Sequence, residues 1–150
     1  MEFRFATEDD AKLLFDWAND PVTRAASFKT DSIAWDEHTA WLNKKLQDPF
    51  CYLFIVMSGD CPCGMVRIDY NPDDEEGIIS YSVAPDYRGR GIGSGMLKLL
   101  DSVVKEYIGS CTLIAEVKED NVASCRCFLK NGYKRLDNDR LAVVFSKKLT

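Results

Sequence analysis

The residues best suited to chemistry lie between positions 83 and 95, where arginines alternate with glycines. They are Arg88, Arg90, Gly89, Gly91, Gly93 and Gly95. Guanidinium groups match the geometry of phosphate oxygens, which they can bind through two parallel hydrogen bonds. Glycines let a phosphate approach the backbone closely and permit positive φ angles. This segment therefore predicts a binding site for a phosphate-bearing ligand.

The elements on either side of this segment would position it. An apolar, β-branched run at 78–83 predicts a strand, and Pro85 ends it because proline cannot donate to a sheet ladder. Apolar residues then recur at helical spacing from Met96 to Tyr107. The order is strand, glycine-rich turn and helix, which presents the unpaired N–H groups and positive dipole end of a helix to an anion.

The spacing separates the known kinds of phosphate loop. A P-loop needs Lys-Ser or Lys-Thr after its glycines, and a dinucleotide fingerprint needs a third glycine where this chain has Ser94 or Met96. The pattern that fits is Arg-x-x-Gly-x-Gly, with Arg88, Gly91 and Gly93. It resembles the acyl-coenzyme A pyrophosphate loop of the GCN5-related N-acetyltransferase (GNAT) family. The alternative is a glycine-rich turn without a ligand.

A second motif lies further along the chain. Asn121, Ser124 and Phe128, followed by Gly132 and Tyr133, resemble the later motif of the same family. The resemblance implies that this helix lies beside the pantetheine arm of the cofactor and that Asn121 contacts the arm. Asn121 by itself also predicts an ordinary helix N-cap, and the two roles are compatible.

This second motif departs from the family pattern at its aromatic residue. Members that use a tyrosine as the acid carry it at the position of Phe128, which has no proton to give. Water, Tyr81 or Tyr87 would then protonate the departing thiolate. Tyr133 stands where the family packs an aromatic ring in the core, so we expect it to be buried.

Composition limits the remaining possibilities. The chain has 150 residues, 46% of them apolar, which suits one globular domain spanning 1–150. A net charge of −5 argues against nucleic-acid binding, which needs a basic surface. The chain contains no run of about 18 apolar residues, so no membrane span is predicted. The amino-terminal residues lack the pattern of a signal peptide, so a cytoplasmic monomer or homodimer is expected.

The cysteines do not indicate a metal site. There are six, none of them spaced as Cys-x-x-Cys, and the chain has one histidine. Zinc sites use clusters of such ligands at short, regular spacing. We therefore expect reduced, structural thiols and no metal cofactor.

Periodicity and turn residues predict the other elements. Strands are expected at 2–6, 51–57, 64–70, 78–83, 111–118, 133–136 and 141–147, and helices at about 7–18, 35–46, 96–107 and 121–131. Residues 20–33 are expected to form a connection, 71–77 an acidic hairpin loop and 137–139 a polar turn. The sum is an α/β (α+β) fold with a mixed, mostly antiparallel sheet of about seven strands and four helices. This order is similar to the layout of the GNAT family.

The resemblance implies transfer of an acetyl group from acetyl-CoA to an amine. The thioester would lie in a splay between the strands at 78–84 and 111–118, with a backbone N–H near Val83 as the donor to the oxyanion. The residues that the resemblance assigns to the cofactor are Ser82, Val83, Arg88, Gly89, Arg90, Gly91, Ile92, Gly93, Ser94, Asn121, Ser124 and Phe128.

The amine must lose a proton to a base. Glu116 is the leading candidate, because it precedes Asn121 by five residues and is similar in placement to the base of ribosomal-protein alanine acetyltransferases of this family. A carboxylate at a strand end is also often just solvated or ion-paired. Asp69 and His38 are the alternatives, although His38 is better explained as a partly exposed helix residue.

The amino-terminal third would select the acceptor. Residues 17–24, with Glu37, His38 and Trp41, resemble enzymes that acetylate amino groups of nucleotide-linked sugars, in particular those of the pseudaminic acid pathway. The implied acceptor-binding residues are Trp17, Arg24, Phe28, Lys29, Trp41 and Arg67, with Arg24 and Lys29 holding phosphates. Core packing is the alternative for the three aromatic residues. Other possible acceptors are a protein amino terminus or a small amine, and a non-catalytic acyl-CoA-binding module also remains open.

Overall fold

A computed structural model describes residues 1–136 and 142–150. In chain order the elements are β1 Glu2–Phe5, η1 Glu8–Asp10, α1 Ala11–Ala18, α2 Pro21–Ala26, α3 Trp35–Gln47, β2 Cys51–Ser58, β3 Cys61–Asn71, β4 Glu76–Val83, η2 Pro85–Tyr87, α4 Ile92–Tyr107, β5 Cys111–Lys118, α5 Val122–Lys130, β6 Lys134–Leu136 and β7 Ala142–Leu149. The predicted polar turn at 137–139 and the predicted strand start at position 141 lie outside the described residues.

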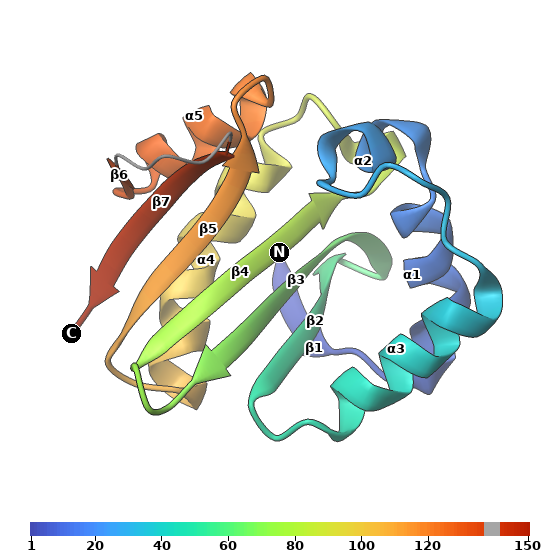
Figure 1. The fold of residues 1–150 in the computed structure, drawn as a ribbon, viewed down its shortest axis with the longest axis horizontal. Helices are drawn as coiled ribbons and strands as arrows, with labels where there is room; N and C mark the ends of the chain where they lie inside the picture. The colour runs from blue at the N-terminus through green and yellow to red at the C-terminus, as the bar shows by residue number, and fades with distance from the viewer. Residues whose placement is uncertain (137–141) are drawn as a thin grey trace.

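The strands form one seven-stranded sheet in the order β1-β2-β3-β4-β5-β7-β6 (Figure 1). Among the described strands only β4 and β5 pair in parallel, and every other neighbouring pair is antiparallel. The predicted fold class and mixed, mostly antiparallel sheet are therefore confirmed. The four predicted helices correspond to α1, α3, α4 and α5.

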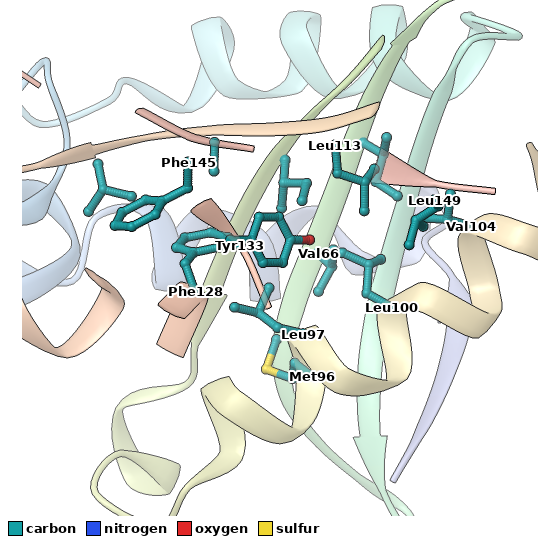
Figure 2. Packing of buried hydrophobic residues seen from close by; sticks show 14 of the residues in the cluster. Val66, Met96, Leu97, Leu100, Val104, Leu113, Phe128, Tyr133, Phe145 and Leu149 are labelled. Atoms are coloured by element: carbon teal, nitrogen blue, oxygen red, sulfur yellow. The ribbon is translucent and has the colours of Figure 1, made fainter. Parts of the chain in front are cut away.

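Helices cover the two faces of the sheet, and each face has its own core. Residues of α4 and α5 pack with β3, β5 and β7 in the larger core, where Phe128, Tyr133 and Phe145 lie ring against ring (Figure 2). Residues of α1 and α3 pack against β2 in the smaller one. Leu53 to Val56 are all buried because β2 is covered on both faces, as its continuous apolar run predicts.

One predicted connection is wrong, because residues 21–26 form the short helix α2. Asp20 caps this helix by accepting a hydrogen bond from the N–H of Thr23 at 3.1 Å, and Pro21 takes its first position. Proline suits a first helical turn as well as it ends a preceding helix. Pro21 therefore does both: it follows the end of α1 and starts α2.

Candidate active site

The predicted phosphate loop connects β4 to α4. Gly89 and Gly91 both have φ of 75°, in the left-handed region that favours glycine. Gly91 is the N-cap of α4, so no side chain covers the first N–H groups of that helix. A Cβ atom at either glycine would meet nothing within 4 Å, and this side of the loop is open. The geometry therefore offers backbone N–H groups and a helix dipole to an anion.

Beside this loop the sheet opens. β4 and β5 pair only through Glu76–Ile78 and Thr112–Ile114, and the strands then diverge toward the loop end (Figure 1). The N–H of Ala84 donates to the carbonyl of Cys63 on β3 at 2.9 Å. Because N–H groups alternate in direction along an extended strand, those of Val83 and Tyr81 point the other way, into the splay. The predicted oxyanion donor near Val83 thus has the required direction.

The first turn of α5 forms the other wall of the splay. Asn121 caps α5 through a hydrogen bond from the N–H of Ser124 at 3.2 Å, so its predicted N-cap role is confirmed. The hydroxyl of Ser124 lies 2.9 Å from that of Tyr81 on β4. This contact links β4 to α5, the helix that follows β5. Tyr81 is one of the three proton donors that the sequence left open, with water and Tyr87.

Phe128 lies deeper than the rest of its motif. Its side chain is 1% exposed and packs edge to face on Tyr81 and Tyr133, with ring centroids 5.6 Å and 5.0 Å apart. Tyr133 is buried, as expected. Contact of Phe128 with the cofactor stays a prediction, and its burial favours a packing role.

The three candidate bases have different surroundings. Glu116 is exposed on β5, on the face opposite the larger core. The carboxylate of Asp69 accepts from Lys45 and Arg67, each at 2.8 Å; burial raises the pKa of Asp69, but these cations lower it overall. His38 is buried rather than partly exposed, because it fills the interface of α1 and α3, with Nε2 2.9 Å from the carbonyl oxygen of Ala11. The surroundings of Asp69 and His38 argue against both as bases, and the role of Glu116 stays a prediction.

Arg88 of the phosphate loop contacts α2. Its guanidinium donates to the carboxylate of Asp20 at 2.6 Å and to the hydroxyl of Thr23 at 3.2 Å. At the other end of α2, Lys118 of β5 donates to the carbonyl of Ala25 at 3.0 Å. The short helix is thus attached both to the phosphate loop and to the end of β5, and it lies near the point where β4 ends (Figure 1).

The predicted acceptor residues divide into two groups. Arg24 donates to the carbonyls of Ala18, Lys29 and Asp31 and to the hydroxyl of Ser27, so its guanidinium holds its own segment together. Phe28 and Lys29, by contrast, are exposed. Only the latter two present open side chains to a ligand.

The other acceptor candidates pack against neighbours. Trp17 is buried in the smaller core, and Trp41 is half-buried with the Arg67 guanidinium 5.2 Å from its ring centroid. Arg67 also donates to Ser80 at 3.2 Å on the adjacent strand β4. Arg67 therefore lies on the sheet face that α1 and α3 cover, beside the part of β4 that diverges from β5.

A cleft of about 490 Å³ adjoins this region between α1 and η2. Its walls come from α1 with the residue that caps α2, from η2 with the residue before it, and from the start of β3. The lining residues are Leu13, Asp16, Trp17, Asp20, Pro62, Ala84, Pro85, Asp86 and Tyr87. The sequence offered Trp17 and Tyr87 as candidate site residues in separate roles but did not predict this cleft, because only the fold brings α1 and η2 together.

A metal site and a membrane-spanning helix each have requirements that the described residues do not meet. No group of three or more His, Cys, Asp or Glu side chains suited to a metal ion occurs in residues 1–136 and 142–150. None of the helices described is long and apolar enough to cross a membrane.

Comparison with known proteins agrees with these observations. A family model described as an acetyltransferase (GNAT) domain matches residues 1–134. An uncharacterized protein of Mycobacterium leprae is 32% identical over 74 residues, which are 49% of this chain. The match spans only 19% of the length of that relative.

Solved structures share the fold at low identity. Spermidine N-acetyltransferase from Vibrio cholerae, solved with CoA and spermine, has a TM-score of 0.87 and 15% identity over 99% of this chain and 95% of that one. The aminoglycoside acetyltransferase AAC(6')-Ib, solved with coenzyme A and kanamycin, has a TM-score of 0.82 and 17% identity over 97% and 93%. A putative acetyltransferase of Salmonella typhimurium, solved with acetyl-CoA, has a TM-score of 0.79 and 19% identity over 100% and 94%.

Proposed function

Because the chain belongs to the acetyltransferase (GNAT) family, we propose that it transfers an acetyl group from acetyl-CoA to a primary amine. The observation that carries this proposal is the splay between β4 and β5, which opens beside the uncapped first turn of α4. The loop from Arg88 to Gly93 would bind the pyrophosphate. The N–H of Val83 would stabilise the oxyanion, because a preorganised donor is worth most where charge develops.

Glu116 is the base in this proposal. It lies on the same face of β5 as Lys118, whose ammonium group reaches α2, and so faces the region where an acceptor would approach the splay. Asp69 is occupied by two cations, and His38 is enclosed by helices. A base acts only within hydrogen-bond reach of the proton, directly or through one water.

For the acceptor we propose the amino group of a nucleotide-linked sugar. The supporting feature is the exposed pair Phe28 and Lys29 on the segment after α2. The ring offers a stacking surface and the ammonium group a charge for a phosphate. Arg24 would hold this segment in place through its four hydrogen bonds rather than touch the phosphates itself.

A small cationic amine is the second candidate acceptor. A net charge of −5 favours attraction of cations over anions. Two structural neighbours were solved with spermine and with kanamycin, both of which carry several amines. A protein amino terminus is the third class of acceptor to be tested.

Mass spectrometry of the products tests both parts of the proposal. Acetyl-CoA would be incubated with a UDP-linked 4-amino sugar, spermine, kanamycin and a short peptide with a free amino terminus. An acetylated UDP-sugar supports the preferred acceptor, and acetylated spermine, kanamycin or peptide would replace it. Acetyl-CoA binding without any product would overturn the enzymatic proposal in favour of a non-catalytic acyl-CoA-binding module.

A pair of variants tests the base. Glu116→Gln should lower kcat about 100-fold, because general bases contribute at least about that much. Glu119→Gln is the matched control, since Glu119 is an exposed carboxylate just past the end of the same strand. Equal rates for the two variants would remove Glu116 from the mechanism.

A further inference from the structure

The side chain of Tyr81 crosses the splay. Tyr81 lies on β4 three residues beyond Ile78, where pairing with β5 ends, and its side chain points to the face covered by α4 and α5. Its hydroxyl reaches the hydroxyl of Ser124 at 2.9 Å, on the helix that follows β5. The phenol therefore spans from one diverging strand to the far wall.

Neighbouring groups fix the ring in this position. A Cβ atom at Gly93, in the first turn of α4, would lie 3.4 Å from Cε2 of Tyr81, so this helix rests on the ring. Phe128 packs edge to face against it from α5. A ring held by two helices and one hydrogen bond presents its hydroxyl at a defined place, which proton transfer requires.

The chemistry of the proposed reaction needs a proton donor at such a place. The amine nitrogen attacks the thioester carbon, the carbon–sulfur bond breaks, and the sulfur leaves as a thiolate. The amine proton goes to a base, and the thiolate must gain a proton from an acid. Phe128 has none to give. The hydroxyl of Tyr133 is buried behind Phe128, and Tyr87 lies on η2 outside the strand.

We propose that the hydroxyl of Tyr81 is the acid that protonates the departing CoA thiolate, with Ser124 as a positioning residue. The inference rests on the proposed acetyl transfer. The Tyr81 O–H bond breaks as the S–H bond forms, and the hydroxyl of Ser124 donates to the resulting phenolate. The phenolate then takes a proton from water, and the protonated base gives the amine proton to the hydroxide that this leaves. Both groups return to their resting state, with no net change in the protein.

The surroundings keep the phenol protonated. Burial raises the pKa of Tyr81, while the hydrogen bond with Ser124 acts in the opposite direction and lowers it less. The titratable groups that face the hydroxyl are the thiols of Cys125 and Cys127 on α5, which also raise its pKa. The acid form is therefore available across the neutral range, and no loss of rate below about pH 9 should arise from Tyr81.

Steady-state kinetics of three variants tests this role, with whichever of the four acceptors the wild-type protein acetylates fastest. Tyr81→Phe should lower kcat about 100-fold and change the KM for acetyl-CoA less than threefold. Ser124→Ala should lower kcat less than that. Tyr133→Phe is the matched control, because its hydroxyl is also buried but has no hydrogen-bond partner among the described residues. It should keep kcat within twofold.

A rescue separates chemistry from packing. In the Tyr81→Phe background, Phe128→Tyr places a hydroxyl on the ring that touches position 81 and should recover at least tenfold in kcat. Thermal melting would identify a double variant that fails to fold, and the comparison of Tyr81→Phe with Tyr133→Phe then decides alone. Equal kcat for those two, or a loss confined to the KM for acetyl-CoA, overturns the inference. Wild-type protein without any turnover overturns the proposed function, and the role of Tyr81 with it.

Discussion

The two halves of this molecule would bind their ligands by different means. In the cofactor half, made of β4, α4, β5 and α5, the candidate groups are backbone N–H groups around Gly91 and in the splay. In the acceptor half, made of α1 to α3 and the face of β3 that they cover, they are long charged side chains that already bond to neighbouring groups. Arg24 is bound to its own segment, and Arg67 to Asp69.

This difference shows how far local sequence can specify a site. A backbone site depends on glycines at fixed spacing, because left-handed φ angles and close approach are local properties. A side-chain site depends on which neighbours compete for each charge, and the fold alone brings those neighbours together. Arg88 belongs to both halves, since it lies in the loop yet bonds to Asp20 of the α2 cap.

The largest effect is expected where β3 supports the cofactor half, at Gly64, which pairs with Val83 of β4. A Cβ atom there would lie 2.5 Å from the carbonyl oxygen of Ser82 and 3.0 Å from Cε of Met96, so β4 must move. Gly64→Ala should lower the free energy of unfolding by about 3 kcal/mol, measured by urea denaturation. Gly59→Ala is the control, because that site has open space and only a strained φ, which costs about 1 kcal/mol. Equal losses would show that the backbones can separate freely.

The next largest effect is expected at Gly91, where a substitution tests whether the backbone N–H groups of α4 bind acetyl-CoA. Gly91→Ala meets no atom within 4 Å but strains a φ of 75°, at a cost of about 1–2 kcal/mol. If the loop relaxes to relieve that strain, the N–H groups of α4 shift and the Kd for acetyl-CoA should rise about tenfold. Isothermal titration calorimetry measures it, with Gly59→Ala as a variant of similar strain. A Kd unchanged by Gly91→Ala would place the phosphates elsewhere.

The link between the halves gives a smaller effect that depends on pH. Asp20→Asn keeps a good N-cap for α2 but removes the charge that Arg88 contacts. Burial raises the pKa of Asp20, yet the hydrogen bonds from Arg88 and Thr23 bring it below the usual 3.8. The variant should therefore be less stable than wild type by about 1 kcal/mol at pH 7.

The sign of this pH dependence follows from the lowered pKa. A carboxyl group whose pKa is lower in the folded state than in the unfolded state stabilises the protein when the pH is above the unfolded-state pKa. That contribution is lost as the pH falls through the folded-state pKa. The difference between wild type and Asp20→Asn should then be constant from pH 7 to 5 and shrink below about 3.8. Urea denaturation at several pH values measures it, and a difference that does not shrink as the pH falls below 3.8 would contradict the ion pair.

The smallest effects are expected in the acceptor half. Lys29→Ala should raise the KM for a UDP-linked amino sugar about twofold to fivefold, because it removes one exposed charge. Arg24→Lys should loosen residues 27–31, seen as faster amide hydrogen exchange, while the Kd for acetyl-CoA stays within twofold. A KM that changes with Arg24→Lys but without faster exchange would return Arg24 to direct contact with the acceptor.

Much of the fold followed from local patterns. Apolar periodicity and turn residues placed all seven strands and four of the helices, and the Asn121 cap and the buried Tyr133 were also predicted correctly. The short helix α2 was missed because Pro21 was interpreted only as the end of α1. Asp20 followed by Pro21 was the available signal, since that pair suits an N-cap and a first helical position.

The sequence by itself determined the elements that carry the candidate cofactor site. Glycine spacing, an N-cap and a strand that ends at a proline act over a few residues, so the chain specifies them locally. Only the tertiary structure decided which charges were already occupied, that His38 is enclosed by two helices, and that Tyr81 meets Ser124 from 43 residues away. Those outcomes depend on the divergence of β4 from β5 and on how helices pack across it, which no short stretch of sequence contains.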